Sequence, residues 1–216
     1  MRAVLVRDNS PGVTVFGGIK GLKRDGDRLE ETFNEIQPDV ILATISPEEA
    51  EGIVNFVKEP YAMTLSDYEM IYGVNLRNYG EVETPAPIFT ESARWSIHGV
   101  VPLIGLDMTE EKFSREYTQN VSTRDLLRHS VRKRGLFKAK FSEPTAEEFV
   151  TKWDAMVNSI RGLRKMEELR IKEIESNLDL IISQGMYHNI LVVSEFEFYP
   201  RIVEFLKHLG YGEKSE

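Results

Sequence analysis

The sequence predicts an α/β protein with a mixed central sheet of about five strands flanked by helices, and with a long, bent helical segment before the last strand. Two observations carry this prediction. Short apolar runs of strand length alternate with helical patterns along the chain, as they do in strand–helix–strand units. The run 40–45 is apolar at nearly every position, which is typical of a central parallel strand buried on both faces. The 216 residues suffice for a single domain with a large core, in which residues 109–185 form a mainly helical subregion.

The first two strands are expected to form a hairpin that runs into a glycine-rich turn. Residues 3–6 and 13–16 are apolar or β-branched, and the turn-forming residues 8–12 lie between them. A hairpin is the simplest connection between two such strands, so part of the sheet is expected to be antiparallel. Three glycines in the segment 17–21 then let the backbone turn closely toward the first helix.

The next helix and strand have recognisable boundaries. Asp27 and Glu30 resemble a capping pair at the start of a helix, which ends before the strand 40–45. Ser46 and Pro47 then begin another helix, with serine as the N-cap and proline at the first helical position. The order strand, helix, strand, helix supports the α/β class.

The middle of the chain is expected to contribute two helices and one strand. Residues 61–80 are rich in aromatic side chains and fit one helix and a loop, and residues 89–97 fit a second helix. The apolar run 100–107 is typical of a buried strand that ends in a carboxylate, Asp107. Pro102 either weakens this prediction or lies near the start of the strand, because proline cannot donate to a strand pairing.

Residues 146–183 carry a nearly continuous apolar stripe at helical spacing. Thr145 and Glu148 have the spacing expected of a capping box at its start. A straight helix of this length would measure roughly 57 Å at ~1.5 Å per residue, which exceeds a domain of this size. We therefore expect a bend or break near Arg161 and Gly162, or an arm that packs on a partner chain.

The chain is expected to end with a strand at 190–193 and a helix at 201–209. The residues 210–216 that follow contain two glycines and several charges, and we expect them to be frayed. The sequence contains neither an internal repeat nor a low-complexity segment.

The composition argues against several classes of protein. The formal net charge is −8 and the pI is near 5.2. This negative charge disfavours binding of the protein to nucleic acids and to anionic membranes. The chain has no cysteine, which excludes disulfides, thiolate catalysis and cysteine-bound zinc. No apolar run approaches the ~18 residues of a membrane span, and charge appears too soon for a signal peptide. We expect a cytoplasmic protein, and abundant glutamate beside three glutamines favours a thermophilic source.

The glycine-rich segment is the first candidate site. Gly17, Gly18 and Gly21 could let backbone N–H groups cradle a phosphate, with Lys20 beside them. The spacing matches neither the Walker pattern nor the dinucleotide-binding pattern. A tight strand-to-helix turn without a ligand is the alternative that the pattern favours.

A row of arginines is the second candidate site. Arg124, Arg128 and Arg132 are spaced by four residues, so they lie in one row on a helix. Further basic residues surround them, namely His129, Lys133, Arg134, Lys138 and Lys140. The row could hold an anionic ligand or a nucleic-acid backbone. A solvated face, or pairing with nearby carboxylates, is the alternative and the favoured one.

Carboxylates that follow predicted strands are the third candidate site. Asp107, Glu195 and Glu197 lie just beyond strands, where catalytic carboxylates are often found, although exposed acids are also common there. The four histidines are dispersed and do not have the spacing of a histidine-rich metal site, so we expect neither a metal nor a cofactor. The sequence has no Gly-x-Ser-x-Gly elbow that would indicate a serine hydrolase.

Several segments together resemble the TraB/PrgY family, whose relatives are the Tiki metalloproteases and the ChaN and erythromycin-esterase group. The segments that carry the resemblance are 13–20, 38–44, Tyr79-Gly80, 92–94, 103–107 and 192–200. The family begins with a strand that runs into Gly-Thr-x-His and continues with a Pro-Asp-Val strand that carries a glutamate. It closes on Val-Val-Gly-x-Gly-His before a last helix. The resemblance spans most of the chain and implies the fold of that family.

The chain departs from the family at each residue that is thought to hold metal there. The first family histidine falls on Lys20, the strand glutamate on Thr44 and the last histidine near Glu197. Protonated lysine cannot ligate a metal, and threonine is a poor ligand. An ion pair between Lys20 and Glu197 could close the cleft instead. The resemblance thus implies a divergent member without the usual metal site.

We expect a catalytically degenerate TraB-like domain that binds an anionic small molecule or a protein partner at the cleft beyond the strand ends. The expected contact residues are Gly17, Gly18, Lys20, Arg124 and Arg128. The alternative is a divalent-metal-dependent hydrolase or transferase that uses Asp107 and Glu197. A third alternative is a scaffold that forms a homo-oligomer through its long helix.

Overall fold

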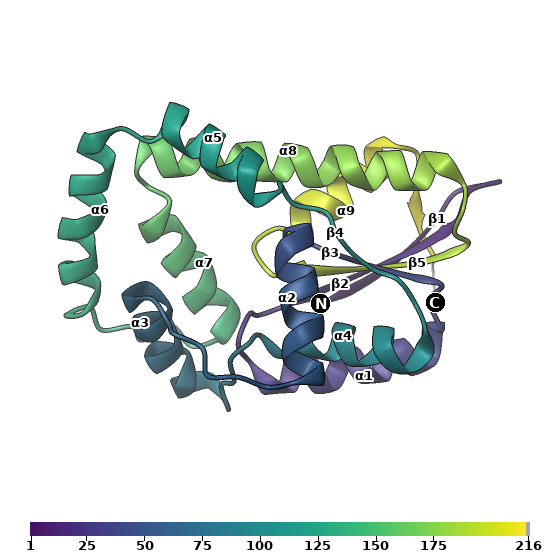
Figure 1. Cartoon of the computed structure of the whole chain (residues 1–216), viewed down its shortest axis with the longest axis horizontal. Coiled ribbons are helices and arrows are strands. Elements are labelled where there is room, and N and C mark those ends of the chain that lie inside the picture. The colour runs from purple at the N-terminus through teal and green to yellow at the C-terminus, as the bar shows by residue number, and fades with distance from the viewer. Residues whose placement is uncertain (215–216) are drawn as a thin grey trace.

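The computed structural model describes residues 1–214, and these residues form a six-stranded mixed sheet with helices on both faces (Figure 1). The strands are β1 (Arg2–Val6), β2 (Gly12–Gly18), β3 (Val40–Ala43), β4 (Leu103–Gly105), β5 (Asn189–Glu195) and β6 (Gly212–Glu213). Their order across the sheet is β4-β3-β5-β2-β1-β6. The pairs among β4, β3, β5 and β2 are parallel, whereas β1 is antiparallel to β2 and to β6. The predicted fold class is confirmed.

Helices connect the strands in the described part of the chain. They are α1 (Lys23–Ile36), α2 (Pro47–Lys58), α3 (Asp67–Leu76), α4 (Pro87–Gly99), α5 (Glu110–Asn120), α6 (Thr123–Leu136), α7 (Ala146–Val157), α8 (Arg161–Gln184) and α9 (Tyr199–His208), and a short 3₁₀ turn, Arg77–Tyr79, follows α3. Figure 1 shows α1 and α4 on one side of the sheet and α8 with α9 on the other. None of the helices within residues 1–214 has both the length and the apolar composition needed to cross a membrane.

The predicted hairpin is confirmed, since β1 and β2 are antiparallel neighbours. The predicted fraying of residues 210–216 is wrong as far as residue 214. Tyr211 is buried, Gly212 pairs with Val6, and the backbone N–H of Lys214 donates to β1 over 2.9 Å. The burial of this one aromatic ring anchors the segment at the sheet edge, where it forms β6. The last two residues of the segment lie outside the described residues.

Two apolar cores cover the two faces of the sheet. Because successive side chains of a strand point to opposite faces, Ile190 and Val192 of β5 face α8 and α9, and Leu191 and Val193 face α1, α2 and α4. The buried side chains that α8 contributes are Ile171, Ile174, Leu178 and Ile182. The continuous apolar runs of β3 and β5 follow from burial on both faces.

A third apolar cluster lies beyond the carboxyl ends of β2 and β5. It joins α3, α7 and the end of α6, which Figure 1 shows beside the sheet and not on its faces. Its centre is Phe149, which is fully buried and packs edge-on against Phe141 with 5.1 Å between ring centroids. This cluster forms the wall that faces the strand ends.

Helix α1 begins earlier than the sequence predicts. It starts at Lys23, so Asp27 and Glu30 lie inside the helix and the predicted capping role for them is wrong. The carboxylate of Asp25 instead accepts the backbone N–H of Ile19 over 2.7 Å. This contact reaches back to the preceding turn and fixes the connection between β2 and α1.

The predicted break in the long helical segment is confirmed. Helix α7 ends at Val157 and α8 begins at Arg161. The guanidinium of Arg132 donates to the carbonyl of Met156 over 2.6 Å. In a continuous helix this carbonyl would accept a backbone N–H from the next turn, so the arginine replaces a helical hydrogen bond that is missing at the break. A Cβ at Gly162 would lie 2.9 Å from a backbone oxygen of α5, so the start of α8 packs closely on α5.

Helix α8 packs on the sheet of its own chain, and the expected self-association through this helix stays a prediction.

Candidate functional site

Four segments bring polar side chains to one place, beyond the carboxyl ends of the parallel strands. Lys20 follows β2, Thr44 follows β3 and Asp107 follows β4, while Glu195 ends β5. The backbone N–H of Glu195 donates to the hydroxyl of Thr44 over 3.0 Å and ties β3 to β5 at this edge. Ligands of α/β proteins usually bind in the crevice outside the carboxyl ends of the strands. The candidate site is therefore this edge of the sheet.

Lys20 is paired with Glu195. Its Nζ lies 3.0 Å from Oε1 of Glu195, and the lysine side chain is 51% exposed, whereas that of the glutamate is 10% exposed. The carboxylate of Glu195 raises the pKa of Lys20. Burial opposes the ionisation of Glu195, but Lys20 and Arg170 hold its pKa below the usual range.

The predicted ion pair of Lys20 with Glu197 is therefore wrong in its partner. Strand β5 ends at Glu195, and residues 196–198 form a turn. In a regular strand, side chains two positions apart point to the same face. The turn removes this regularity, so Glu197 does not repeat the position of Glu195.

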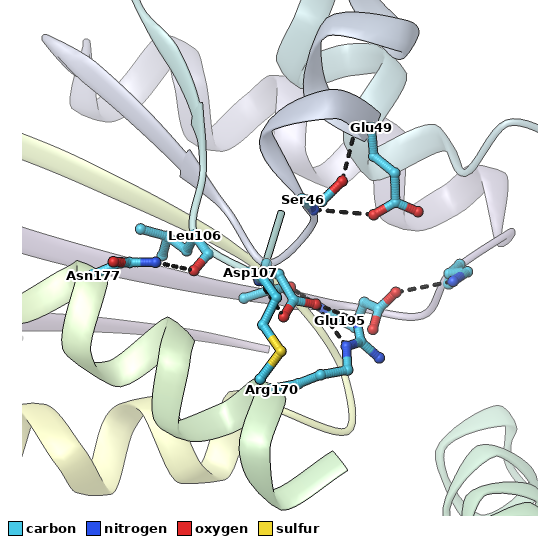
Figure 2. A network of polar contacts seen from close by, with 10 residues as sticks. Ser46, Glu49, Leu106, Asp107, Arg170, Asn177 and Glu195 are labelled. Carbon is cyan, nitrogen blue, oxygen red and sulfur yellow. Dashed lines mark hydrogen bonds and ion pairs between the residues drawn. The ribbon is translucent and has the colours of Figure 1, made fainter. Parts of the chain in front are cut away.

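Asp107 is paired with Arg170 of α8, and Figure 2 shows the arginine reaching toward it. Nε and Nη2 of Arg170 each lie 2.6 Å from Oδ2 of Asp107, and the backbone N–H of Met108 donates to Oδ1 over 2.7 Å. Burial raises the pKa of Asp107 in spite of the opposing effect of Arg170. The guanidinium also lies 5.1 Å from the ring centroid of Phe198. Both oxygens of this candidate catalytic carboxylate are thus engaged within the protein.

Glu197 has a buried carboxyl oxygen without a hydrogen bond. Its Oε2 has no partner among residues 1–214, and the same holds for the buried hydroxyl of Tyr72. Burial, followed by the charge of Glu195, raises the pKa of Glu197 to about 8. Burial likewise raises the pKa of Tyr72. At neutral pH both groups carry a proton, so each can donate a hydrogen bond into the site.

Three neighbouring cavities open around these residues. The first has a volume of about 270 Å³, the second about 490 Å³ and the third about 200 Å³. The first and second share the lining residues Lys20, Glu69 and Tyr72. The second and third share Glu195 and Glu197. The three cavities are therefore parts of one cleft, which we call the strand-end cleft.

The second cavity combines carboxyl groups with aromatic rings. Its carboxyl side chains are Glu69, Asp154, Glu195 and Glu197, and its aromatic side chains include Tyr68, Tyr72 and Trp153. Tyr68 stacks on His129 with 4.2 Å between ring centroids, and its hydroxyl donates to the backbone carbonyl of His129 over 2.8 Å. Burial lowers the pKa of His129, so the imidazole is neutral at neutral pH.

The third cavity contains Glu167, another carboxyl group with a raised pKa. Burial, followed by the charge of Asp154, raises the pKa of Glu167 to about 7. Burial also raises the pKa of Asp154 itself. Carboxyl groups that crowd into one partly dry space resist ionising together.

The structure places Gly17 and Gly18 inside β2, so the predicted position of the glycine-rich turn is wrong for these two residues. A Cβ at Gly17 would lie 2.6 Å from the ring of Tyr199, and one at Gly18 would lie 2.7 Å from Ile88. Close packing of helices on the strand accounts for both glycines. Of the predicted contact residues in this segment, Lys20 reaches the first and second cavities.

Arg124 and Arg128 lie exposed on α6. Neither lines the cavities found in the described part of the chain. Arg132, the third arginine of the row, donates to the backbone carbonyl of Met156 in the last turn of α7 and to the hydroxyl of Ser159 just after it. The row exists on a helix as predicted, but the structure does not bring it to the strand-end cleft.

Sequence reasoning missed Arg170, Tyr72 and Trp153 as site residues. Arg170 left a signal, because it occupies a position between Met166 and Ile174 in the apolar i, i+4 stripe of α8. A charged side chain on a buried helix face requires a partner, and this requirement could have singled it out. Tyr72 and Trp153 left no such signal, since aromatic residues at helical spacing indicate a core as readily as a site.

Within residues 1–214, no three His, Cys, Asp or Glu side chains are grouped where they could hold a metal ion. The fold and the cleft define an α/β protein whose cleft, at the carboxyl ends of the parallel strands, is lined by both charged and apolar side chains. A scan against protein-family models gives no match for this chain, and a search of the curated proteins gives none either. The resemblance to the TraB/PrgY family stays a prediction.

Proposed function

We propose that the chain is a small-molecule-binding protein whose ligand lies in the strand-end cleft. The observation that carries the proposal is the first cavity, a mostly apolar space of about 270 Å³ that shares Lys20, Glu69 and Tyr72 with the larger second cavity, whose lining carries four carboxyl side chains. Ligand sites are concave and mostly apolar, with a few polar groups that fix the orientation of the ligand. The first cavity would hold the apolar body of the ligand, and the second would hold a polar head group.

The apolar cavity has walls from helices on opposite sides. Ile53 and Phe56 of α2 and Phe89 of α4 line it, as does Tyr72 of α3. Phe56 packs edge-on against Tyr61, with 5.4 Å between ring centroids. Burial of an apolar group as large as a leucine or phenylalanine side chain contributes roughly 1.5–3 kcal/mol, so the ligand gains affinity by placing such a group here.

An anionic head group, which the sequence analysis predicts, has one anchor in this cleft. The ammonium of Lys20 is half-exposed, but Glu195 already lies 3.0 Å from it. An anion would bind there in competition with a carboxylate of the protein itself. The proposed ligand site is therefore the cleft of the predicted TraB-like, catalytically degenerate domain, and the proposed function does not require the ligand to be an anion.

Filling the apolar cavity tests the proposal. Gly52 of α2 lines the cavity, and a Cβ at this position meets nothing within 4 Å, so Gly52→Leu adds a side chain there without a backbone clash. We expect the wild-type protein to bind the uncharged dye N-phenyl-1-naphthylamine saturably. We expect Gly52→Leu to weaken this binding by at least about tenfold, because the leucine occupies the space of the dye. A fluorescence titration measures both.

Gly135→Leu is the matched control. Gly135 also lies in a helix with nothing within 4 Å of a Cβ, but it is on α6, outside the lining of the apolar cavity. Both substitutions replace a helical glycine and are expected to stabilise the protein by about 0.5–1 kcal/mol. Unchanged dye binding by Gly52→Leu, or the absence of saturable binding by the wild type, contradicts the proposal.

A metal-dependent hydrolase or transferase that uses Asp107 and Glu197 is the second candidate function. The observation that favours it is a carboxyl that holds its proton, Glu197, beside an ionised one, Glu195. Environments that push two pKa values apart assign the roles of acid and base. Elemental analysis of the purified protein tests this function. A stoichiometric divalent metal that Glu197→Gln removes supports it, and a folded protein that stays metal-free after incubation with divalent cations contradicts it.

A further inference from the structure

We propose that the second cavity binds an organic cation, namely an ammonium group whose apolar substituent lies in the first cavity. This inference rests on the proposed function and deepens it, because it names the chemical class of the ligand. Three features of the second cavity carry it: the charge of its lining, its aromatic walls and the buried carboxyl group of Glu197.

Carboxyl groups outnumber cations in the lining of the second cavity. Glu69, Asp154, Glu195 and Glu197 line it, and among the described residues there Lys20 is the one basic side chain that is charged at neutral pH. Lys20 is bound to Glu195 and compensates for that carboxylate. A cationic ligand would supply the positive partner that the remaining carboxyl groups lack, whereas an anion would be repelled by their negative charge.

Aromatic rings wall the same cavity. The ring of Trp153 lies 5.5 Å from that of Tyr72 at an angle of 61°, and 6.4 Å from that of Tyr68 at 76°. Rings at such steep angles enclose a corner between them. An ammonium group over a ring face is attracted to the negative charge of the π-system by about 0.5–2 kcal/mol, and aromatic cages of this kind bind substituted ammonium ions in proteins.

Glu197 has a carboxyl oxygen to which a bound cation could donate a hydrogen bond. Its Oε2 is buried, has no hydrogen-bond partner in the described part of the chain, and belongs to a residue that lines both the second and the third cavity. Without a ligand this carboxyl group is mostly protonated at neutral pH. An ammonium N–H would donate to the carboxylate and stabilise its ionised form. The ligand then keeps its own proton, and one proton leaves Glu197 for the solvent.

Titratable and charged groups from every surrounding element line the two cavities together with Glu197. They are Lys20 after β2, Tyr68, Glu69 and Tyr72 on α3, Tyr117 on α5, His129 on α6, Asp154 on α7, Glu167 and Arg170 on α8, and Glu195 on β5. Glu167 has a pKa of about 7 and also titrates near neutral pH. A variant of Glu197 is therefore needed to assign the released proton.

Three ligands of one shape test the inference: 4-phenylbutylamine, 4-phenylbutan-1-ol and 4-phenylbutyrate, which are cationic, neutral and anionic at pH 7. Isothermal titration calorimetry in two buffers of different ionisation enthalpy gives both the affinity and the number of protons released. We expect the amine to bind at least about tenfold more tightly than the alcohol, and the butyrate to bind most weakly. Binding of the amine at pH 7 is expected to release close to one proton, because the pKa of Glu197 is about 8.

Glu197→Gln keeps the size of the side chain and removes its charge. We expect this variant to bind the amine no more tightly than the alcohol, to release little or no proton, and to bind the alcohol as the wild type does. Glu204→Gln is the matched control, since Glu204 is an exposed carboxylate of α9 outside the lining of the cleft. This control is expected to change neither the affinity nor the proton release.

Each outcome separates this inference from the proposed function. Equal binding of amine and alcohol, tighter binding of the butyrate, or proton release that persists in Glu197→Gln overturns the assignment of a cation. Failure of all three compounds to bind a protein that binds the naphthylamine dye also overturns it and leaves the proposed function standing. Failure of the dye as well overturns both.

Discussion

Arg170 reaches the strand-end cleft from α8 and brings its guanidinium to Asp107, with Glu195 close by (Figure 2). Burial of charged groups costs solvation free energy, and the partner returns it only while the pair is complete. The loss of one partner therefore costs more than the loss of both. At the scale of single residues, such pairs decide which polar groups of the cleft are engaged and which remain open to a ligand.

Asp107→Asn breaks this pair while it keeps the size of the side chain. We expect the free energy of unfolding at pH 7 to fall by about 2–4 kcal/mol, because Arg170 loses the carboxylate that both of its nitrogens contact. Urea denaturation measures the loss. The double variant Asp107→Asn with Arg170→Met is expected to recover part of it, since no unpaired cation remains. A single variant as stable as the wild type would falsify the role given to the pair.

Glu197→Gln is expected to stabilise the protein, with a defined pH dependence. The pKa of Glu197 rises from the usual 4.5 to about 8 in the folded state, so between these values the folded protein holds a proton that the unfolded chain has released. Stability from this group is therefore lost as pH rises from about 4.5 to about 8. Glutamine has no such linkage, and the variant should gain roughly 4 kcal/mol at pH 8 and nothing below pH 4.5. Urea denaturation at several pH values measures this, and a gain that does not vary with pH contradicts it.

The sequence predicts which residue types gather at the strand ends but not which of them pair. Asp107, Glu195, Glu197 and Lys20 are all identified from their places after apolar runs. The partner of Lys20 depends on where β5 stops, and a shift of two residues changes the answer from Glu195 to Glu197. Arg170 comes from a helix that is distant in sequence, so its pairing with Asp107 follows from the tertiary packing of α8.

Strand β4 and helix α2 meet at Gly105, where the two elements approach as closely as backbone allows. A Cβ at this position would lie 2.5 Å from the carbonyl group of Ser46 and 2.6 Å from the nitrogen of Pro47. Ser46 caps α2 in a capping box, with its hydroxyl accepting from Glu49 and its own N–H donating to the carboxylate of Glu49, each over 3.0 Å. The start of α2 is therefore held by its own cap and by contact with the strand.

Gly105→Ala is expected to lower the free energy of unfolding by about 2–4 kcal/mol, because the added methyl meets backbone atoms that cannot rotate away. Gly52→Ala, in the same helix that Gly105 contacts, is the control. Its Cβ meets nothing within 4 Å, and it is expected to stabilise by about 0.5–1 kcal/mol. Thermal and urea denaturation of both variants give the two signs, and equal effects would contradict the close approach of β4 and α2.

Elements with local signals were predicted well, and those set by distant contacts were not. The cap at Ser46 and the break before Arg161 could be read from neighbouring residues. The start of α1 could not, because Asp25 accepts the N–H of Ile19 in the preceding turn and not a group in the helix itself. Strand β6 could not either, since two residues gain strand geometry only by pairing with β1 at the other end of the chain.

At the scale of the whole molecule, neither the location of the basic residues relative to the cleft nor the order of the strands could be predicted from the sequence. The chain has a net charge of −8, yet its basic row lies on α6, beside the sheet and outside the lining of the strand-end cleft. This separation was not visible in the sequence, where the row and the cleft both offered places for an anion. The order of the strands was not visible either, because parallel pairs join segments that are far apart along the chain.

Strand β5 lies between β2 and β3, although residues 189–195 come more than a hundred residues after both of them. During synthesis on the ribosome, β2 and β3 therefore wait for a common neighbour, and the two apolar cores lack their shared strand until it emerges. A chain that stops at His188 is expected to be digested by dilute protease where the whole protein resists, since it cannot close the sheet. The same late segment brings Glu195, with Glu197 directly after it. The nascent protein thus gains its central strand and the acidic lining of its cleft in one step of translation.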